Sequence, residues 1–302
     1  MPSNRRTYSA YGPGFDPDAG RRMIFKHQYA VVRGMLSALS PAPEAMSTKA
    51  DALINLFAGT VRGWRGSLVL SRKPQQPARQ LKLYDIEACP YCRLVREALT
   101  EMDLDALILP CPAGGTRFRL EAGQIGGKQQ FPLLVDDNTG RKLYESAEIV
   151  DYLKQTYGGG RSAARGLGRL LALATSYLAS AFMLRLGGIR GVKACPSRAP
   201  EQPLQLFSFE ASPFSKPVRA RLCELELPYV LRNAGKGGWK DMGPPSFRDK
   251  LFKGPMGTTR NRQWLAERTG QVQVPYLIDA NTATAMYESQ DILDYLDRTY
   301  AR

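Results

Sequence analysis

Two stretches of the chain repeat one another, and this duplication constrains the fold more than any other feature. The first copy runs from residue 81 to 157 and the second from 204 to 300. The copies begin 123 positions apart, as Leu83 and Leu206 show, and end 143 positions apart. The second copy therefore carries about twenty extra residues, between its second strand and an X-Pro turn. The sequence predicts two versions of one folding unit.

Each copy has the same predicted order of elements: strand, turn, helix, strand, variable segment, X-Pro, strand, turn, strand, helix. Helical spacing of apolar residues marks the first helix of each copy, and Asp-Asn-rich runs at 136–140 and 279–282 mark a hairpin turn in each. The helix residues are Val95, Leu99 and Met102 in the first copy and Val218, Leu222 and Leu225 in the second. A βαβ unit followed by ββα predicts an α/β protein of two tandem thioredoxin-like domains, each burying its own core.

The 302 residues divide into four predicted segments. They are an N-terminal extension at 1–79 with an amphipathic helix, the first domain at 80–158, an apolar helical linker at 159–203 and the second domain at 204–302.

Two segments outside the repeats carry alternative interpretations. The amphipathic helix, from Ser47 to Trp64, is typical of a helix packed on a neighbouring domain, or of one lying on a membrane or partner. Residues 170–184 contain no charge, but fifteen residues are short for a membrane span, which needs about 20. We expect this run to be a buried helix between the domains. The alternative is contact with a bilayer surface or membrane-embedded subunits.

The charge and the cysteines limit the partners and the compartment. A net charge of +14 favours an acidic partner or surface, but no nucleic-acid recognition motif accompanies it, so nucleic acid is not expected. Five cysteines with one close pair do not form the framework of a secreted domain, and the N-terminus has no apolar signal region. We expect a reducing compartment, the chloroplast or another plastid or the cytoplasm, and not secretion.

Cys89 and Cys92, in the run Cys89-Pro90-Tyr91-Cys92, are the residues best suited to covalent chemistry. The pattern places Cys89 at a helix start, where unpaired backbone N–H groups stabilise a thiolate. Cys92 follows within one turn, so it can attack a mixed disulfide on Cys89 and release the reduced substrate. A zinc site would need a second pair of ligands, so we expect redox chemistry and no metal.

The second copy has serines at the equivalent positions, in the run Ser212-Pro213-Phe214-Ser215. A hydroxyl does not form a disulfide, so the second copy is predicted to be redox-silent.

An X-Pro pair precedes a strand in each copy, Phe131-Pro132 in the first and Val274-Pro275 in the second. In this fold we expect a cis proline, which presents the preceding backbone amide to a peptide-like substrate beside the nucleophile. The alternative is a proline that only begins a strand.

A Glu-Ser pair precedes the last helix of each copy, Glu145-Ser146 and Glu288-Ser289. A hydroxyl and unpaired amides at a helix N-terminus bind a carboxylate, and a neighbouring glutamate binds an ammonium group. The pair suits the α-amino acid end of a γ-glutamyl group. Helix capping is the alternative.

These motifs together resemble the N-terminal, glutathione-binding domain of glutathione transferases and the related glutaredoxins. CPYC is similar to glutaredoxins, YES before the last helix is similar to the γ-glutamyl site of transferases, and SPFSKPVRARL resembles a serine-type transferase. A closer resemblance is to tandem-domain proteins of cyanobacteria and plastids, through LPCPAGGTRFR, GGKQQFPLLVD and ELELPYVLRNAGKG.

The resemblance implies glutathione as co-substrate. In the first copy its implied binding residues are Tyr91, Phe131, Pro132, Glu145 and Ser146. In the second copy the implied site comprises Ser212, whose hydroxyl would bind a glutathione thiolate, and Val274, Pro275, Glu288 and Ser289.

The chain departs from the family pattern in two ways. No stretch after Tyr157 or Tyr300 is long enough for the all-helical domain that forms the electrophile pocket of transferases, so conventional transferase activity is not expected. Glutaredoxins usually carry a lysine just before the dithiol, where this chain has Glu87-Ala88. We expect the acid to raise the pKa of the neighbouring thiol and slow it.

The sequence therefore predicts a glutathione-linked thiol-disulfide oxidoreductase that acts on protein or small-molecule disulfides. The alternative is a non-catalytic docking subunit of a larger, membrane-associated photosynthetic or organellar complex, held through the N-terminal extension and the helix at 167–186. A third interpretation is a prostaglandin-isomerase-like enzyme, which uses a related cysteine motif.

Overall fold

The computed structural model describes residues 63–71, 76–158, 171, 173–176, 190–241, 251 and 257–302. The predicted amphipathic helix lies almost entirely outside these residues, as does most of the uncharged run at 170–184. In the described part of the chain, no helix combines the length and the apolar character needed to cross a membrane.

Both repeats have the predicted order of elements. The first comprises β1 (Leu81–Asp85), α3 (Pro90–Glu101), β2 (Ala106–Pro110), α4 (Arg119–Gly126), β3 (Leu133–Asp136), β4 (Arg141–Leu143) and α5 (Ser146–Thr156). The second comprises β5 (Leu204–Ser208), α7 (Ser215–Glu224), β6 (Tyr229–Asn233), η1 (Trp239–Asp241), α9 (Arg260–Thr269), β7 (Tyr276–Asp279), β8 (Thr284–Met286) and α10 (Ser289–Tyr300). The variable segments, for which no element was predicted, contain α4 in one repeat and η1 and α9 in the other.

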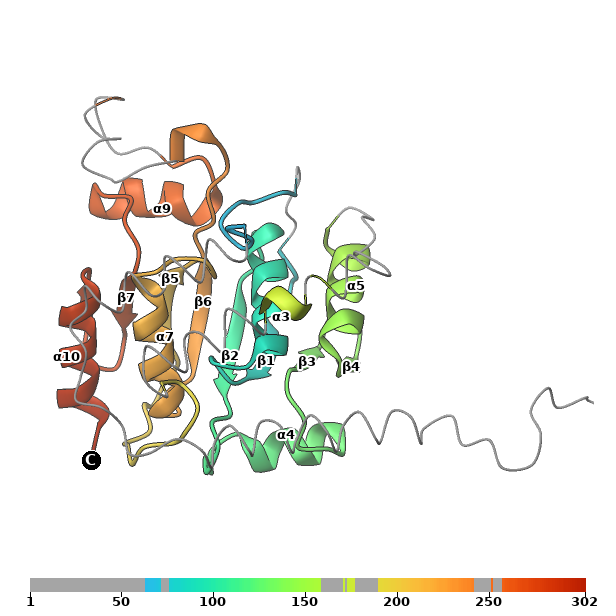
Figure 1. Cartoon of the computed structure of the whole chain (residues 1–302). Coiled ribbons are helices and arrows are strands. Elements are labelled where there is room, and N and C mark those ends of the chain that lie inside the picture. The colour runs from blue at the N-terminus through green and yellow to red at the C-terminus, as the bar shows by residue number, and fades with distance from the viewer. Residues whose placement is uncertain are drawn as a thin grey trace, which may run out of the picture. The chain divides into compact units, whose positions relative to one another are not determined.

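The strands of the two repeats form one eight-stranded sheet in the order β4-β3-β1-β2-β6-β5-β7-β8 (Figure 1). The join is the antiparallel pair of β2 and β6, in which Ala106 lies opposite Leu231 and Ile108 opposite Tyr229. Within each repeat β1 is parallel to β2, and β5 to β6. The order is palindromic, so an approximate twofold axis passes through the β2–β6 pair.

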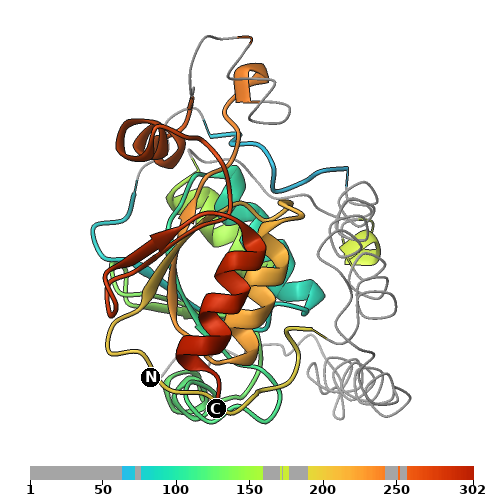
Figure 2. The same cartoon turned by 90° about the vertical axis from the view of Figure 1, so that its left-hand side faces the viewer.

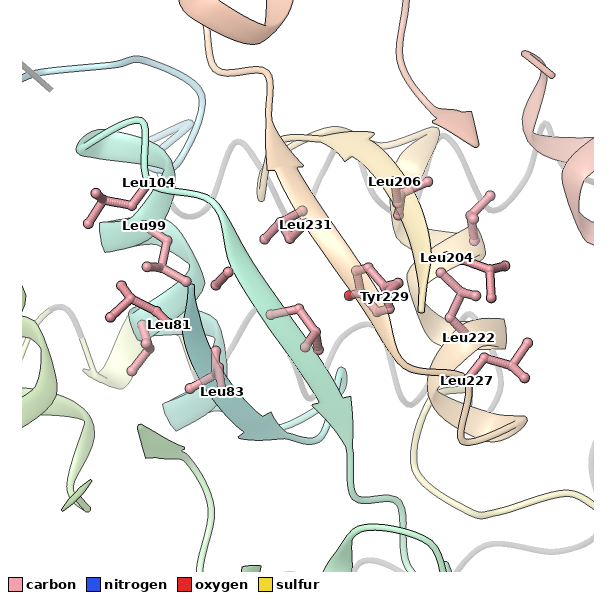
Figure 3. Packing of buried hydrophobic residues seen from close by; sticks show 14 of the residues in the cluster. Leu81, Leu83, Leu99, Leu104, Leu204, Leu206, Leu222, Leu227, Tyr229 and Leu231 are labelled. Carbon is pink, nitrogen blue, oxygen red and sulfur yellow. The ribbon is translucent and has the colours of Figure 1, made fainter. Parts of the chain in front are cut away.

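The prediction that each domain buries its own core is wrong. Buried residues of β1, α3 and α5 belong to the same apolar cluster as those of β5, α7 and α10. Figure 3 shows β2 and β6 side by side, with the labelled leucines of both repeats gathered around them. An unpaired β2 edge would expose its backbone N–H and C=O groups and the apolar side chains beside it. Pairing with β6 gives the backbone groups hydrogen-bond partners and buries the side chains.

The alternation of side chains along the strands assigns the helices to faces. Leu83 and Leu134 point into the large cluster with α3 and α5, whereas Tyr84 and Leu133 belong to a second cluster that includes Ala122 of α4. In the second repeat, α7 and α10 lie on one side of the strands (Figure 2). Figure 2 is viewed from the end of the sheet that carries β8.

The duplication extends upstream of both predicted domains. Gly-x-Arg-Gly occurs at 63–66 and again at 188–191. Gly66 and Gly191 both have positive φ, at 74° and 70°, and each following segment makes a parallel bridge to the opposite repeat. These segments, the leaders, are residues 66–70 and 191–195.

The leaders make matching backbone hydrogen bonds. In the first, Val69 donates to the carbonyl of Lys236 (2.8 Å) in the second repeat, and Leu70 donates to Glu101 (2.7 Å) at the end of α3. In the second, Ala194 donates to Ala113 (2.9 Å) in the first repeat. Each leader therefore ties its own repeat to the other.

The part of the predicted helical linker at 190–203 is extended and bridged, not helical. A helix is disfavoured there by Pro196, Pro200 and Pro203. The backbone hydrogen bonds of the second leader keep this segment extended. Of the uncharged run, residues 171 and 173–176 are helical; Leu171 is exposed, whereas Ser176 is fully buried and donates to the carbonyl of Pro90 (2.8 Å).

A buried aspartate closes the hairpin of each repeat. Asp136 accepts hydrogen bonds from the hydroxyls of Tyr152 and Tyr157, both at 2.6 Å. Asp279 accepts them from Tyr295 at 2.7 Å and Tyr300 at 2.5 Å. Burial alone would raise the pKa of each carboxyl group, but the tyrosine hydrogen bonds outweigh it and lower the pKa.

Candidate functional site

The first candidate site lies where β1 ends and β3 begins. Tyr84 pairs with Leu133, so the loop from β1 to Cys89 and the Phe131-Pro132 turn that enters β3 meet at one end of the sheet. β4 runs antiparallel to β3, so α5 starts at the same end. The topology thereby brings the predicted dithiol, X-Pro and Glu-Ser motifs of the first repeat together.

Cys89 is the N-cap residue of α3, and Pro90 occupies the first turn. Proline suits this position because its missing N–H would have no partner there. Cys89 is half-buried and so is Tyr91, whereas Cys92 is completely buried. The Cys92 sulfur lies 3.5 Å from the backbone nitrogen of Ile86. Of the two thiols, Cys89 is the one accessible to a substrate.

The two thiols have opposite pKa shifts. A hydrogen bond from Cys92 lowers the pKa of Cys89, and the N–H groups of Cys92 and Tyr91 and the charge of Arg96 add to the effect against the opposing influence of burial. Burial, together with the hydrogen bond to Cys89, raises the pKa of Cys92 well above its ordinary value. The site therefore stabilises a thiolate at Cys89 and a neutral thiol at Cys92.

The expected slowing of this thiol by Glu87 does not prevail, because the net shift of the Cys89 pKa is downward. The Glu87 carboxylate is buried and occupied by two guanidinium groups: it lies 3.1 Å from Arg219 and 3.4 Å from Arg96. Paired in this way, the acid does not act as an uncompensated negative charge beside Cys89.

Both X-Pro bonds are cis, as predicted, at Phe131-Pro132 and Val274-Pro275. The residue before each pair was missed by sequence reasoning. Gln130 donates to the Glu145 carboxylate at 2.7 Å, which ties the X-Pro loop to the start of α5. Gln273 occupies the corresponding position of the second copy, and this repetition is the sequence signal that could have identified Gln130.

The Glu-Ser pair does not act as a side-chain helix cap. Glu145 is the N-cap residue of α5, but its side chain makes no capping bond, and its backbone has φ 62°. Glu288 in the second repeat has φ 64° and is likewise no side-chain cap. Positive φ costs conformational free energy for a residue with a side chain. The same strained backbone conformation occurs at corresponding positions of the two repeats. The first N–H groups of each helix remain without intrahelical partners.

Arg119, at the start of α4, is a further residue that sequence reasoning missed. Its guanidinium lies over the Phe131 ring, 4.9 Å from the centroid, and donates to the carbonyl of Cys111 at 2.7 Å. It adds a positive charge beside the X-Pro turn. Sequence analysis assigned no element to this variable segment, and the position of Arg119 depends on α4.

The second repeat assembles the equivalent residues but closes the site. Its helix α7 begins at Ser215, so Ser212 is not the N-cap residue. The Ser215 hydroxyl donates to the Ser212 hydroxyl at 2.8 Å, and Ser212 is only 2% exposed. Gln273 holds Glu288 at 2.6 Å, as in the first repeat, but here the glutamate is exposed. Pro275 is buried, whereas Val274 and Ser289 are half-buried.

No group of three or more metal-ligating side chains occurs among the described residues. The site consists of a helix-start thiolate, a buried second thiol and a cis-proline turn on a thioredoxin-like sheet, which defines a thioredoxin-fold protein with a thiol site.

The chain belongs to the glutathione S-transferase N-terminal domain family. This family matches residues 83–161 and 206–302, more than half of the chain, so the domain occurs twice in tandem. Membership supports a glutathione-related function for the thioredoxin fold.

Two solved structures are similar to parts of the chain. A glutathione transferase of Bombyx mori is 26% identical over 37% of this chain and 50% of that chain, with a TM-score of 0.25. A trimeric glutathione transferase of Leishmania is 14% identical over 74% of this chain and 68% of that chain, with a TM-score of 0.24. The chain thus spans half the length of the Bombyx mori protein. No protein of curated function matches.

Proposed function

We propose that the first repeat is a glutathione-dependent thiol-disulfide oxidoreductase with Cys89 as its nucleophile. The observation that carries the proposal is the division between the two thiols: Cys89 is accessible with a lowered pKa, and Cys92 is buried with a raised one. A thiolate attacks disulfides faster than a thiol of the same site, and a neighbouring neutral thiol is available to resolve the product.

The reaction would proceed by two exchanges. The Cys89 thiolate attacks the glutathione sulfur of a mixed disulfide, forms a Cys89–glutathione disulfide and releases the other thiol, which takes up a proton. A second glutathione thiolate then attacks the glutathione sulfur, forms oxidised glutathione and regenerates the Cys89 thiolate. With a protein disulfide, the Cys89 thiolate would first form a mixed disulfide with one substrate sulfur and release the other. Cys92 would then attack the Cys89 sulfur, its proton passing to the departing substrate sulfur, and leave a Cys89–Cys92 disulfide for glutathione to reduce.

The surrounding groups suit the peptide part of glutathione. The N-terminus of α5 with Ser146 would bind the γ-glutamyl carboxylate, and Glu145, held by Gln130, would bind the ammonium group. The cis turn at Phe131-Pro132 would align the backbone, and Tyr91 would lie beside the sulfur. The proposal requires a glutathione pool, hence a reducing compartment such as a plastid or the cytoplasm.

The test is the reduction of a glutathione mixed disulfide by the purified chain, with reduced glutathione as the electron donor and oxidised glutathione measured as the product. Turnover that disappears in Cys89→Ser supports the proposal. A matched control is Cys195→Ser, since Cys195 is also half-buried but lies in a leader. Absence of turnover in the folded, reduced protein contradicts the proposal. Most of the N-terminal extension and of the helix at 167–186, on which the docking role rests, lies outside the described residues.

A further inference from the structure

Four buried side chains form a crossed ion network between the repeats. Arg219 of α7 binds Glu87, which precedes α3, with its Nε at 3.1 Å from a carboxylate oxygen. Arg96 of α3 binds Glu210, which precedes α7, with its Nε at 2.9 Å. Arg219 also lies 3.1 Å from Glu210. Each arginine therefore reaches across the β2–β6 join to the loop that carries the other repeat's candidate site.

The two halves of the ion network adjoin residues of different reactivity. Glu87 is two residues from Cys89, and Arg96 is the cation whose charge favours the Cys89 thiolate. Glu210 is two residues from Ser212, which does not ionise in this range. Only the first half of the network adjoins a group whose reactivity depends on the charge around it.

The remaining charged groups around the network come from three elements. Asp85, at the end of β1, binds Arg96, and burial raises the pKa of this carboxyl to about 6. From α3, Arg93 lies 3.4 Å from Glu97 and 3.8 Å from Glu210. From α7, Lys216 faces the network, and burial together with the charge of Arg93 lowers its pKa to about 7. Acids and bases are nearly balanced here, so losing one cation leaves an excess of negative charge.

We propose that Arg219, from the second repeat, is a positioning residue for Cys89 in the first: it binds the Glu87 carboxylate, so that this acid does not offset the positive charge of Arg96, whose guanidinium donates to the Glu87 carbonyl at 2.8 Å, two residues before Cys89. The inference rests on the proposed function of Cys89 and extends it across the join. The second repeat, which has no thiol at Ser212 or Ser215, thereby supplies part of the charge environment of the thiol chemistry.

The effect follows from how the acids share their cations. With Arg219 present, Glu87 has two guanidinium partners, and Glu210 has the same two together with Arg93. Without Arg219, Glu87 would retain Arg96 as its guanidinium partner, and Arg96 would also face Glu210 and Asp85. The resulting negative charge beside Cys89 disfavours the thiolate, because a like charge nearby raises the pKa of an acid.

The test measures Cys89 directly. Alkylation of Cys89 by iodoacetamide, followed on the Cys89 peptide by mass spectrometry, gives the pH midpoint of thiolate formation in the full chain. In Arg219→Met the midpoint should rise by about one pH unit, which makes alkylation below the midpoint about tenfold slower. Adding Glu87→Gln to this variant removes the unpaired acid and should return the midpoint toward that of the original chain.

A matched control separates charge from loss of packing. Arg262, in α9, is as buried as Arg219 and forms a 3.2 Å ion pair with Asp241, away from the dithiol. Arg262→Met should leave the Cys89 midpoint unchanged. An unchanged midpoint in folded Arg219→Met, an equal shift in Arg262→Met, or failure of Glu87→Gln to restore the midpoint overturns the inference.

A second variant decides the question if Arg219→Met does not fold. Glu87→Gln alone removes the acid and leaves Arg219 as an extra cation, so the Cys89 midpoint should fall. A midpoint that stays or rises in this variant overturns the inference. Alkylation requires no glutathione, so a negative oxidoreductase assay would contradict the proposed function without changing this result.

Discussion

The two repeats share a backbone and differ at the point where chemistry would occur. Both have the cis X-Pro turn, the Gln–Glu hydrogen bond and the positive-φ glutamate before the last helix. In the first, however, the helix begins immediately after Cys89, which is half-buried; in the second, it begins at Ser215, and Ser212 is enclosed and hydrogen-bonded. The scaffold of a site is thus retained in both copies, whereas an accessible, ionisable nucleophile occurs in one.

The largest expected effect comes from removing the feature that distinguishes the first repeat. Cys89→Ser should abolish disulfide exchange, because a hydroxyl does not form a disulfide. Cys92→Ser should retain activity on glutathione mixed disulfides, since a second glutathione can resolve the intermediate. The rate at which oxidised glutathione is produced measures the activity of both variants. If the two variants match the original chain, the chemistry lies elsewhere or does not exist.

Installing cysteines in the second repeat tests whether sulfur alone makes the difference. Ser212→Cys with Ser215→Cys, in a Cys89→Ser background, should restore little or no turnover, because position 212 is enclosed and is not the N-cap of its helix. Thiol titration of the unfolded protein confirms that both cysteines are present and reduced. Turnover close to that of the original chain would show that the second site is open after all.

The hairpin aspartates test whether the repeats are equivalent in stability. Asp136→Asn and Asp279→Asn each weaken a pair of tyrosine hydrogen bonds, and each should lower the free energy of unfolding by about 1–3 kcal/mol. Because the core is continuous across the join, both variants should shift a single urea unfolding transition. Two separate transitions, each moved by only one variant, would show that the repeats unfold independently.

The last expected effect is a pH dependence at Lys216, which replaces Arg93 of the first repeat. Burial lowers the pKa of Lys216 to about 7 in the folded chain, from 10.5. Between these values the unfolded chain binds more protons than the folded one, so this residue makes stability rise with pH, by at most ~1.4 kcal/mol per pH unit.

Lys216→Met should therefore flatten the pH dependence of unfolding above pH 7, and Lys240→Met, an exposed lysine of the same repeat, should leave it unchanged. Identical slopes in the original chain and in Lys216→Met would contradict the expected titration.

Much of the fold was predictable because it is encoded by local patterns that occur twice. Val95 and Leu99, spaced one helical turn apart, are both buried in α3, and their counterparts Val218 and Leu222 are buried in α7. The cis geometry at Pro132 and Pro275 followed from the element order. Each of these features depends on residues close together in the chain.

The features that sequence reasoning missed depend on distant partners. Glu87 alone predicts a slower thiol, and its partner Arg219 lies 132 positions away. The join of the sheets depends on two short edge strands, β2 and β6, whose sequences are compatible with separate domains. Arg119 reaches Phe131 only because α4 forms in a segment with little helical periodicity. Pairwise electrostatics and strand-edge pairing are not readable from local spacing.

The crossed leaders bear on how such a chain arose. Each leader contacts its own helix and the opposite copy through the same set of bonds, which is the contact expected between the two subunits of a symmetric homodimer. A precursor with one copy would have carried every group that this contact needs, so two molecules could have formed the same sheet. Fusion of the two genes would then have removed the requirement that the subunits be identical. The two halves were then free to differ, with cysteines in one and serines at the corresponding positions of the other.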